Sequence, residues 1–125
     1  MGQIVLAREE AFTLGGLRVV PAKREVRAAE RREVLQPRVM QVLVALSRRR
    51  GNVVSHDELI ERCWDGCAVS DDAIHRCIAR LRRLAKAHGG YTVETIARVG
   101  YLLSENPPGR ETPGGQNEPW EWFPL

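Results

Sequence analysis

Three arginines recur at close to helical spacing between residues 71 and 87, where the sequence carries its clearest chemical signal. Arg76 and Arg80 stand one helical turn apart, and Arg83 follows on the same side of a helix. A guanidinium presents a planar fork of N–H donors that matches phosphate oxygens and the O6 and N7 atoms of guanine. The spacing therefore predicts an anion-binding helix face, and the competing interpretation is an ordinary solvated basic surface.

The other side of this helix is expected to be buried. Ile74, Ile78, Leu81 and Ala85 recur with the helical period and form the predicted core face. The segment 70–72, Ser-Asp-Asp, caps the N-terminus and places negative charge at the positive end of the helix dipole. The face opposite the core collects Asp72, Arg76, Ala79, Arg80 and Arg83, with Lys86 alongside.

A second group of reactive residues is compatible with a metal site but does not favour one. Cys63 and Cys67, with His75 and Cys77 nearby, could be drawn as a zinc ligand set. However, Cys63 and Cys77 take apolar helix positions, and a second tight Cys/His pair is missing, so we expect buried free cysteines and no metal. None of the three histidines has a matching nucleophile in a recognisable turn. We therefore expect no catalytic residues, no cofactor and no enzyme activity.

Length and composition limit the remaining classes of protein. The 125 residues suffice for one domain, and no window is apolar enough to predict a membrane span. An odd number of cysteines, three, and an N-terminus without a secretory signal favour a reducing cytoplasm. Residues 1–103 hold 18 of the 19 Lys and Arg residues but only 12 of the 16 Asp and Glu residues. The positive charge thus belongs to the predicted domain, 1–103, and suits a partner rich in phosphate.

Short β-branched runs predict a small antiparallel sheet in the first third of the chain. These runs are residues 4–6, 17–20 and 33–35, separated by breaks at 15–16 and 21–22.

Helices are expected to follow the sheet. Pro37 suits the first position of a helix that ends in a basic turn before Gly51. Ser55 and Glu58 form a capping box for a second helix, which precedes the arginine-bearing one. Residues 91–95 and 99–103 predict a hairpin with its tip near 96–98.

The order of sheet, three helices and hairpin is that of a winged helix-turn-helix with an N-terminal antiparallel sheet, an α+β fold. Residues 35–103 also carry a series of specific motifs: Leu-x-Pro at 35–37, Val-Val-Ser at 53–55, Cys-Trp-Asp at 63–65 and Thr-Ile-x-Arg-x-Gly-Tyr at 95–101. With these motifs the segment resembles the DNA-binding effector domain of the OmpR/PhoB family. It is most similar to the receiver-less subgroup that includes the CadC- and ToxR-like regulators.

The resemblance implies a DNA-binding transcription regulator of bacterial type, located in the cytoplasm at the nucleoid. The recognition helix, 71–87, would lie in the major groove, and the wing, 91–103, would reach the minor groove. Carried over by position, the helix contacts fall on Asp72, His75, Arg76, Ala79, Arg80 and Arg83, and the wing contact falls on Arg98. Lys86 joins this set through its place beside the arginine face. Double-stranded DNA is the predicted partner, bound as a dimer by a protein that is monomeric or weakly dimeric when free.

Residues 104–125 form a predicted flexible acidic tail that the family pattern does not explain. Proline, glycine and glutamate are frequent in it, and it ends in the aromatic motif Trp120, Trp122 and Phe123. This motif predicts either docking to a partner, such as RNA polymerase or another regulator, or docking onto the domain itself; we favour the partner. The alternative function for the whole chain is accordingly a winged-helix protein-interaction module. Three arginines on one helical stripe favour DNA instead.

Overall fold

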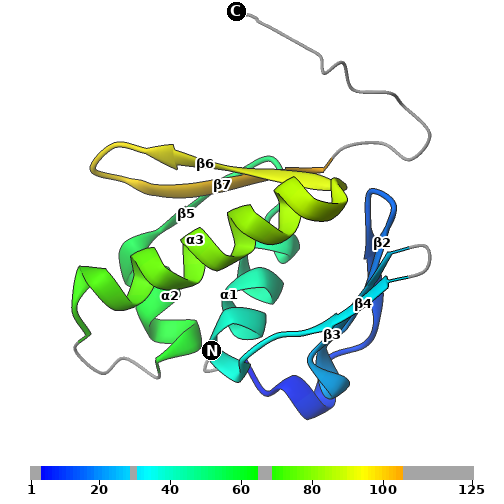
Figure 1. The fold of residues 1–125 in the computed structure, drawn as a ribbon. Helices are drawn as coiled ribbons and strands as arrows, with labels where there is room; N and C mark the ends of the chain where they lie inside the picture. The colour runs from blue at the N-terminus through cyan, green and yellow to red at the C-terminus, as the bar shows by residue number, and fades with distance from the viewer. Residues whose placement is uncertain (1–3, 29–30, 65–68, 106–125) are drawn as a thin grey trace, which may run out of the picture.

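Two antiparallel sheets flank a set of three helices in the computed structural model (Figure 1). The structure describes residues 4–28, 31–64 and 69–105. The predicted α+β winged helix-turn-helix is confirmed, since the three helices precede a C-terminal hairpin and follow an N-terminal sheet. Cys67 and the aromatic residues Trp120, Trp122 and Phe123 lie outside the described residues.

The N-terminal sheet has four strands in the order β1-β2-β3-β4. Their bounds are Phe12–Leu14, Leu17–Val20, Glu25–Ala28 and Arg31–Val34. The short 3-10 helices Leu6–Arg8 and Pro21–Lys23 precede β1 and β3. The predicted strand at 17–20 is confirmed, and the one predicted at 33–35 starts two residues earlier and ends one residue earlier.

The predicted strand at 4–6 is wrong. The Arg8 amide donates to the Val5 carbonyl at 3.0 Å, which closes a 3-10 turn, and the Ile4 amide donates to the Arg62 carbonyl at 2.8 Å. This segment is therefore hydrogen-bonded to the last turn of the helix His56–Cys63 and does not pair in a sheet. Ile4 is buried there, which explains why its apolar character resembled that of a strand.

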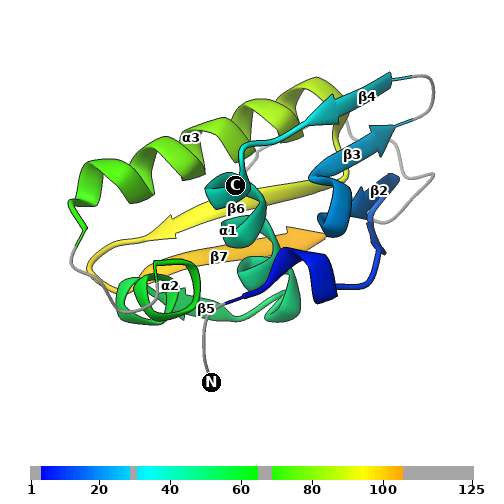
Figure 2. The same ribbon diagram turned by 90° about the horizontal axis from the view of Figure 1, so that it is seen from below.

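Three helices carry the core of the domain. Helix α1 spans Pro37–Arg48, α2 spans His56–Cys63 and α3 spans Asp71–His88. Pro37 takes the first helical position of α1, as predicted. Buried side chains of α1 pack against both other helices, and they include Val42, Leu43 and Leu46. Helix α1 is thus the central element against which α3 is held (Figure 2).

Half of the predicted capping box forms at the start of α2. The Glu58 amide donates to the Ser55 hydroxyl at 3.1 Å, but the Glu58 carboxylate accepts from Arg49 at 2.6 Å instead of returning to Ser55. An arginine from the end of α1 is a stronger donor than a backbone amide, because its hydrogen bond is charge-assisted. The contact also ties α1 to α2.

The second sheet contains the predicted hairpin and one further strand. Strands β6, Tyr91–Ile96, and β7, Gly100–Glu105, form the hairpin, and β5, Val53–Ser55, pairs with the outer side of β7. The hairpin prediction is confirmed with each strand slightly longer than expected. Among the described residues, no helix combines the length and the apolar character that crossing a membrane would need.

Candidate nucleic-acid interface

Helix α3 presents most of the predicted contact residues to solvent. Asp72, His75, Arg76, Ala79, Arg83 and Lys86 are all exposed. The predicted core residues Ile74, Ile78 and Leu81 are buried on the other side, together with Cys77 and Leu84, while Ala85 is half-buried. The 18-residue helix is therefore amphipathic, as predicted. One face is basic and exposed, and the opposite face is apolar and packed in the core.

Within the described part of the chain, the guanidinium groups of Arg76 and Arg83 are available to an external anion. Among the described residues, no carboxylate lies within ion-pair distance of either side chain. The arginines at the end of α1 differ in this respect, because Arg48 pairs with Glu9 and Arg49 pairs with Glu58. An unpaired guanidinium keeps all its donors available for phosphate or a base edge.

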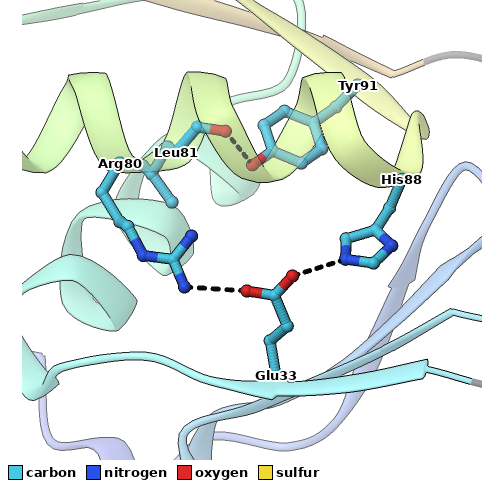
Figure 3. Close-up of polar contacts among 5 residues, drawn as sticks. All are labelled: Glu33, Arg80, Leu81, His88 and Tyr91. Carbon is cyan, nitrogen blue, oxygen red and sulfur yellow. Dashed lines mark hydrogen bonds and ion pairs between the residues drawn. The ribbon is translucent and has the colours of Figure 1, made fainter.

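Arg80 is placed differently from the other arginines of α3. Its Nη2 atom donates to Glu33 Oε1 of strand β4 at 2.8 Å, and the second oxygen of Glu33 lies 2.7 Å from His88 Nε2 (Figure 3). The side chains of Arg80 and Glu33 are 29% and 30% exposed, whereas His88 is 5% exposed. One carboxylate thus joins the N-terminal sheet to two positions on α3, and we call these three residues the Glu33 clamp.

The clamp also favours the ionised form of the Glu33 carboxyl. Hydrogen bonds from Arg80 and then His88 lower the pKa of the Glu33 carboxyl below its ordinary value. In the unfolded chain that pKa returns to about 4.3. A carboxyl whose pKa is lowered by folding stabilises the folded state above its unfolded pKa, and this contribution is lost as the pH falls through the folded pKa.

A pH-dependent loss of stability is therefore expected for Glu33→Gln. At pH 7 the variant should be less stable than the parent by about 1 kcal/mol, as befits a partly exposed ion pair. The difference should shrink as the pH falls below about 4.3 toward the lowered pKa of Glu33 in the folded protein, so it should be smaller at pH 3 than at pH 7. Urea unfolding at both pH values measures it, with Glu61→Gln on the exposed side of α2 as the control. A difference that stays constant between pH 7 and pH 3 would contradict the assignment.

The wing is attached to α3 by a residue that sequence reasoning did not select. Arg82 Nε donates to the Val93 carbonyl at 3.1 Å, and Arg82 Nη2 donates to Thr95 Oγ1 at 2.6 Å. The buried Tyr91 hydroxyl adds a third link by donating to the Leu81 carbonyl at 2.5 Å, and burial raises the pKa of this phenol. These bonds set the angle between helix and wing. Local pattern carries no signal for these bonds, because the acceptors of Arg82 lie on another element.

Arg98 stands at the tip of the wing, where it was predicted. The side chain is exposed, and the residue adopts a left-handed backbone with φ of 65°. The Val99 amide donates to the Ile96 carbonyl at 3.0 Å and closes the turn. A non-glycine residue in this conformation is uncommon. The turn places Arg98 between the end of β6 and the start of β7.

The two described cysteines belong to the core. Cys63 and Cys77 are free and buried. Burial raises the pKa of the Cys63 thiol to about 12 and also raises the pKa of Cys77, so both remain protonated near neutral pH. A cysteine binds zinc as a thiolate, so two protonated cysteines are poor zinc ligands. In the part of the chain that the structure describes, no three His, Cys, Asp or Glu side chains gather as a metal ligand set.

Comparisons with known proteins agree with this geometry. The CadC transcriptional activator of Escherichia coli is 28% identical over 99 residues, which cover 77% of this chain and 19% of CadC. The transcriptional regulatory protein CseB of Streptomyces coelicolor is 35% identical over 92 residues, which cover 74% of this chain and 38% of CseB. The chain therefore spans less than half the length of these relatives.

A solved structure and a family model match the same region. The solved DNA-binding domain of Escherichia coli CadC is similar with a TM-score of 0.69 and 26% identity, and the match covers 78% of this chain and 94% of that domain. The model of the family "Transcriptional regulatory protein, C terminal" matches residues 30–103. The chain therefore belongs to this family, the OmpR/PhoB-type winged-helix domains of transcriptional regulatory proteins.

Proposed function

We propose that this domain binds double-stranded DNA with sequence specificity and regulates transcription at the bacterial nucleoid. The observation that carries the proposal is the exposed face of α3, on which Arg76 and Arg83 have no carboxylate partner among the described residues. A helix of this width fits the major groove of B-DNA, where paired donors on arginine match guanine O6 and N7. Family membership supports the same reading.

The wing gives the domain a second point of contact. With α3 in the major groove, the exposed Arg98 at the hairpin tip would reach the adjacent minor groove, which attracts arginine through its negative potential. The bonds from Arg82 to β6 hold helix and wing at one angle. The protein would thus dock as a preformed unit, which avoids the entropic cost of ordering the wing on binding.

Arg80 would contribute to this interface by exchanging partners. In the free domain its guanidinium is held by Glu33 at 2.8 Å. A bound duplex would offer guanine O6 and N7 as well as phosphate oxygens at the same helix face, and these acceptors would compete with the carboxylate for the same donors. His75 and Lys86 share a helical stripe with Arg82, which contacts the wing, and Asp72 lies in the first turn of α3. These side chains would extend the contact along the groove on both sides of Arg76.

Salt dependence provides the direct test of this function. If the domain neutralises about six phosphates, the logarithm of its DNA affinity should fall with the logarithm of salt concentration at a slope of about −5. Fluorescence anisotropy with labelled duplexes, selected from a pool of genomic fragments, measures that slope. Failure to bind any fragment at low salt would overturn the proposal and favour the alternative of a protein-interaction module.

Two copies are expected on each DNA site. One domain of this size reads only a few base pairs, which cannot define a unique genomic position. We expect a mainly monomeric free protein that binds repeated half-sites, so footprinting at saturation should protect two neighbouring half-sites. Protection of a single half-site at saturation would contradict this expectation.

A further inference from the structure

A groove runs along one side of α3, between that helix and strand β4. Its volume is about 570 Å³. Val34, Val39 and Cys77 supply its apolar surface, and Arg76, Arg80 and Arg83 line it from α3. Val34 is 59% exposed, although it is a large apolar side chain next to the basic helix. The groove therefore offers apolar contacts and guanidinium groups within the same space, and we call it the α3–β4 groove.

A ligand that fits both properties carries aromatic rings and carboxylates close together. Aromatic rings bury apolar area and also attract guanidinium groups through their faces. Duplex DNA presents phosphates but no free aromatic side group to a shallow apolar surface such as that around Val34. The apolar part of the groove is thus left without a role by the proposed DNA contact.

The chain itself contains a segment of this composition. Residues 118–125 read Glu-Pro-Trp-Glu-Trp-Phe-Pro-Leu and combine two carboxylates with three aromatic rings and no basic residue. The sequence alone favours docking of this segment to a partner, but the groove provides a complementary surface within the domain. We propose that the segment docks into the α3–β4 groove of its own domain and competes with DNA for the arginines of α3. The proposal concerns the control of the DNA-binding surface proposed above and rests on that function for its consequence.

The connection is long enough for an intramolecular contact. Strand β7 ends at Glu105, which pairs in register with Tyr91, two residues after the glycine that caps the end of α3. At 1.5 Å per residue, Arg83 lies about 8 Å and Arg76 about 18 Å back along the helix from its last residue, His88. The twelve residues 106–117 span at most about 40 Å when extended. The segment can therefore reach the whole groove.

Tethering makes weak contacts sufficient. A short flexible connection gives an effective concentration in the millimolar range. A segment whose free-peptide affinity is a few tenths of a millimolar would then occupy its groove most of the time. Because DNA binds only the open fraction, its apparent affinity would be lowered by about 3- to 10-fold.

The test uses the full chain and a triple variant, Trp120→Ser with Trp122→Ser and Phe123→Ser. Amide chemical shifts of the two proteins should differ at Val34, Ala79 and Arg83 and agree at Arg18 and Arg49, which lie elsewhere. The differences should not depend on protein concentration, and the variant should bind DNA about 3- to 10-fold more tightly. A second variant, Glu118→Gln with Glu121→Gln, should show smaller changes of the same kind.

Two valine variants, one inside the groove and one outside it, separate docking from a general surface effect. Val34→Ser should increase the quenching of tryptophan fluorescence by acrylamide. Val5→Ser, at a valine outside the groove that is 50% exposed against 59% for Val34, should leave it unchanged. Shift differences that are missing from the groove, or that grow with protein concentration as docking between copies would, overturn the proposal. If shifts appear in the groove but no variant binds DNA, docking stands and the proposed function fails.

Discussion

Arg76→Ala is expected to weaken binding to a specific DNA site by about 5- to 150-fold. This range corresponds to about 1–3 kcal/mol, the contribution of one bidentate contact between arginine and a base. Arg76 is exposed on α3 and has no carboxylate partner among the described residues, so its loss removes an external contact without breaking an internal one. Anisotropy titrations on the selected site and on a scrambled duplex measure the difference, which should be large only for the selected site.

Arg49→Ala serves as the matched control for this experiment. Arg49 is also exposed, but it follows α1 and pairs with Glu58, so it should at most touch a phosphate. Its replacement should weaken binding to both duplexes equally and only slightly. Arg80→Ala should resemble Arg76→Ala in its loss of specificity, with a small loss of stability because the Glu33 clamp is broken. Equal losses on both duplexes for all three variants would show that α3 is not the reading helix.

The elements that form the interface could be predicted because each carries local signals. The amphipathic period of α3 is regular over 18 residues, and the hairpin strands flank a short tip. The N-terminal sheet was harder to predict, because its strands are only three or four residues long. Strand β3 reads Glu-Val-Arg-Ala and buries Glu25, which is neutralised by Arg27 at 2.9 Å and Arg32 at 3.2 Å. Strand prediction assigns apolar residues to the buried face and charged residues to the exposed face, so a buried glutamate hides the pattern.

The contacts that position the interface could not be predicted from local pattern. Glu33 and Arg80 are 47 residues apart, and their pairing depends on where the sheet lies against α3. Helical spacing places Arg80 on the arginine side of the helix but does not show that a carboxylate from another element meets it there. The same limit applies to Arg82, whose acceptors lie on β6. Periodicity identifies the faces of an element, whereas ion pairs between elements depend on tertiary packing.

Gly100→Ala is expected to have the largest effect on folding. A methyl group at residue 100 would lie 2.0 Å from the Val54 carbonyl oxygen and 2.8 Å from Ser55 Cα, so it would collide with the backbone of β5. Ser55 and Gly100 are paired in register, and neither backbone can move without separating β5 from β7. We expect a destabilisation of about 3 kcal/mol, at the upper end for overpacking. In thermal unfolding this corresponds to a fall in Tm of about 10–25 °C.

Gly16→Ala provides the control, because nothing lies within 4 Å of a methyl group there. Its Tm should stay within a few degrees of the parent, since a surface substitution free of clashes changes stability by about 0.5 kcal/mol or less. Gly100→Ala should also weaken DNA binding, because Ser55 caps α2 and β7 supports the wing. An unchanged Tm for Gly100→Ala would mean that β5 and β7 are not in close contact. The pairing of β5 with β7 would then not be what holds α2 and the wing in place around α3.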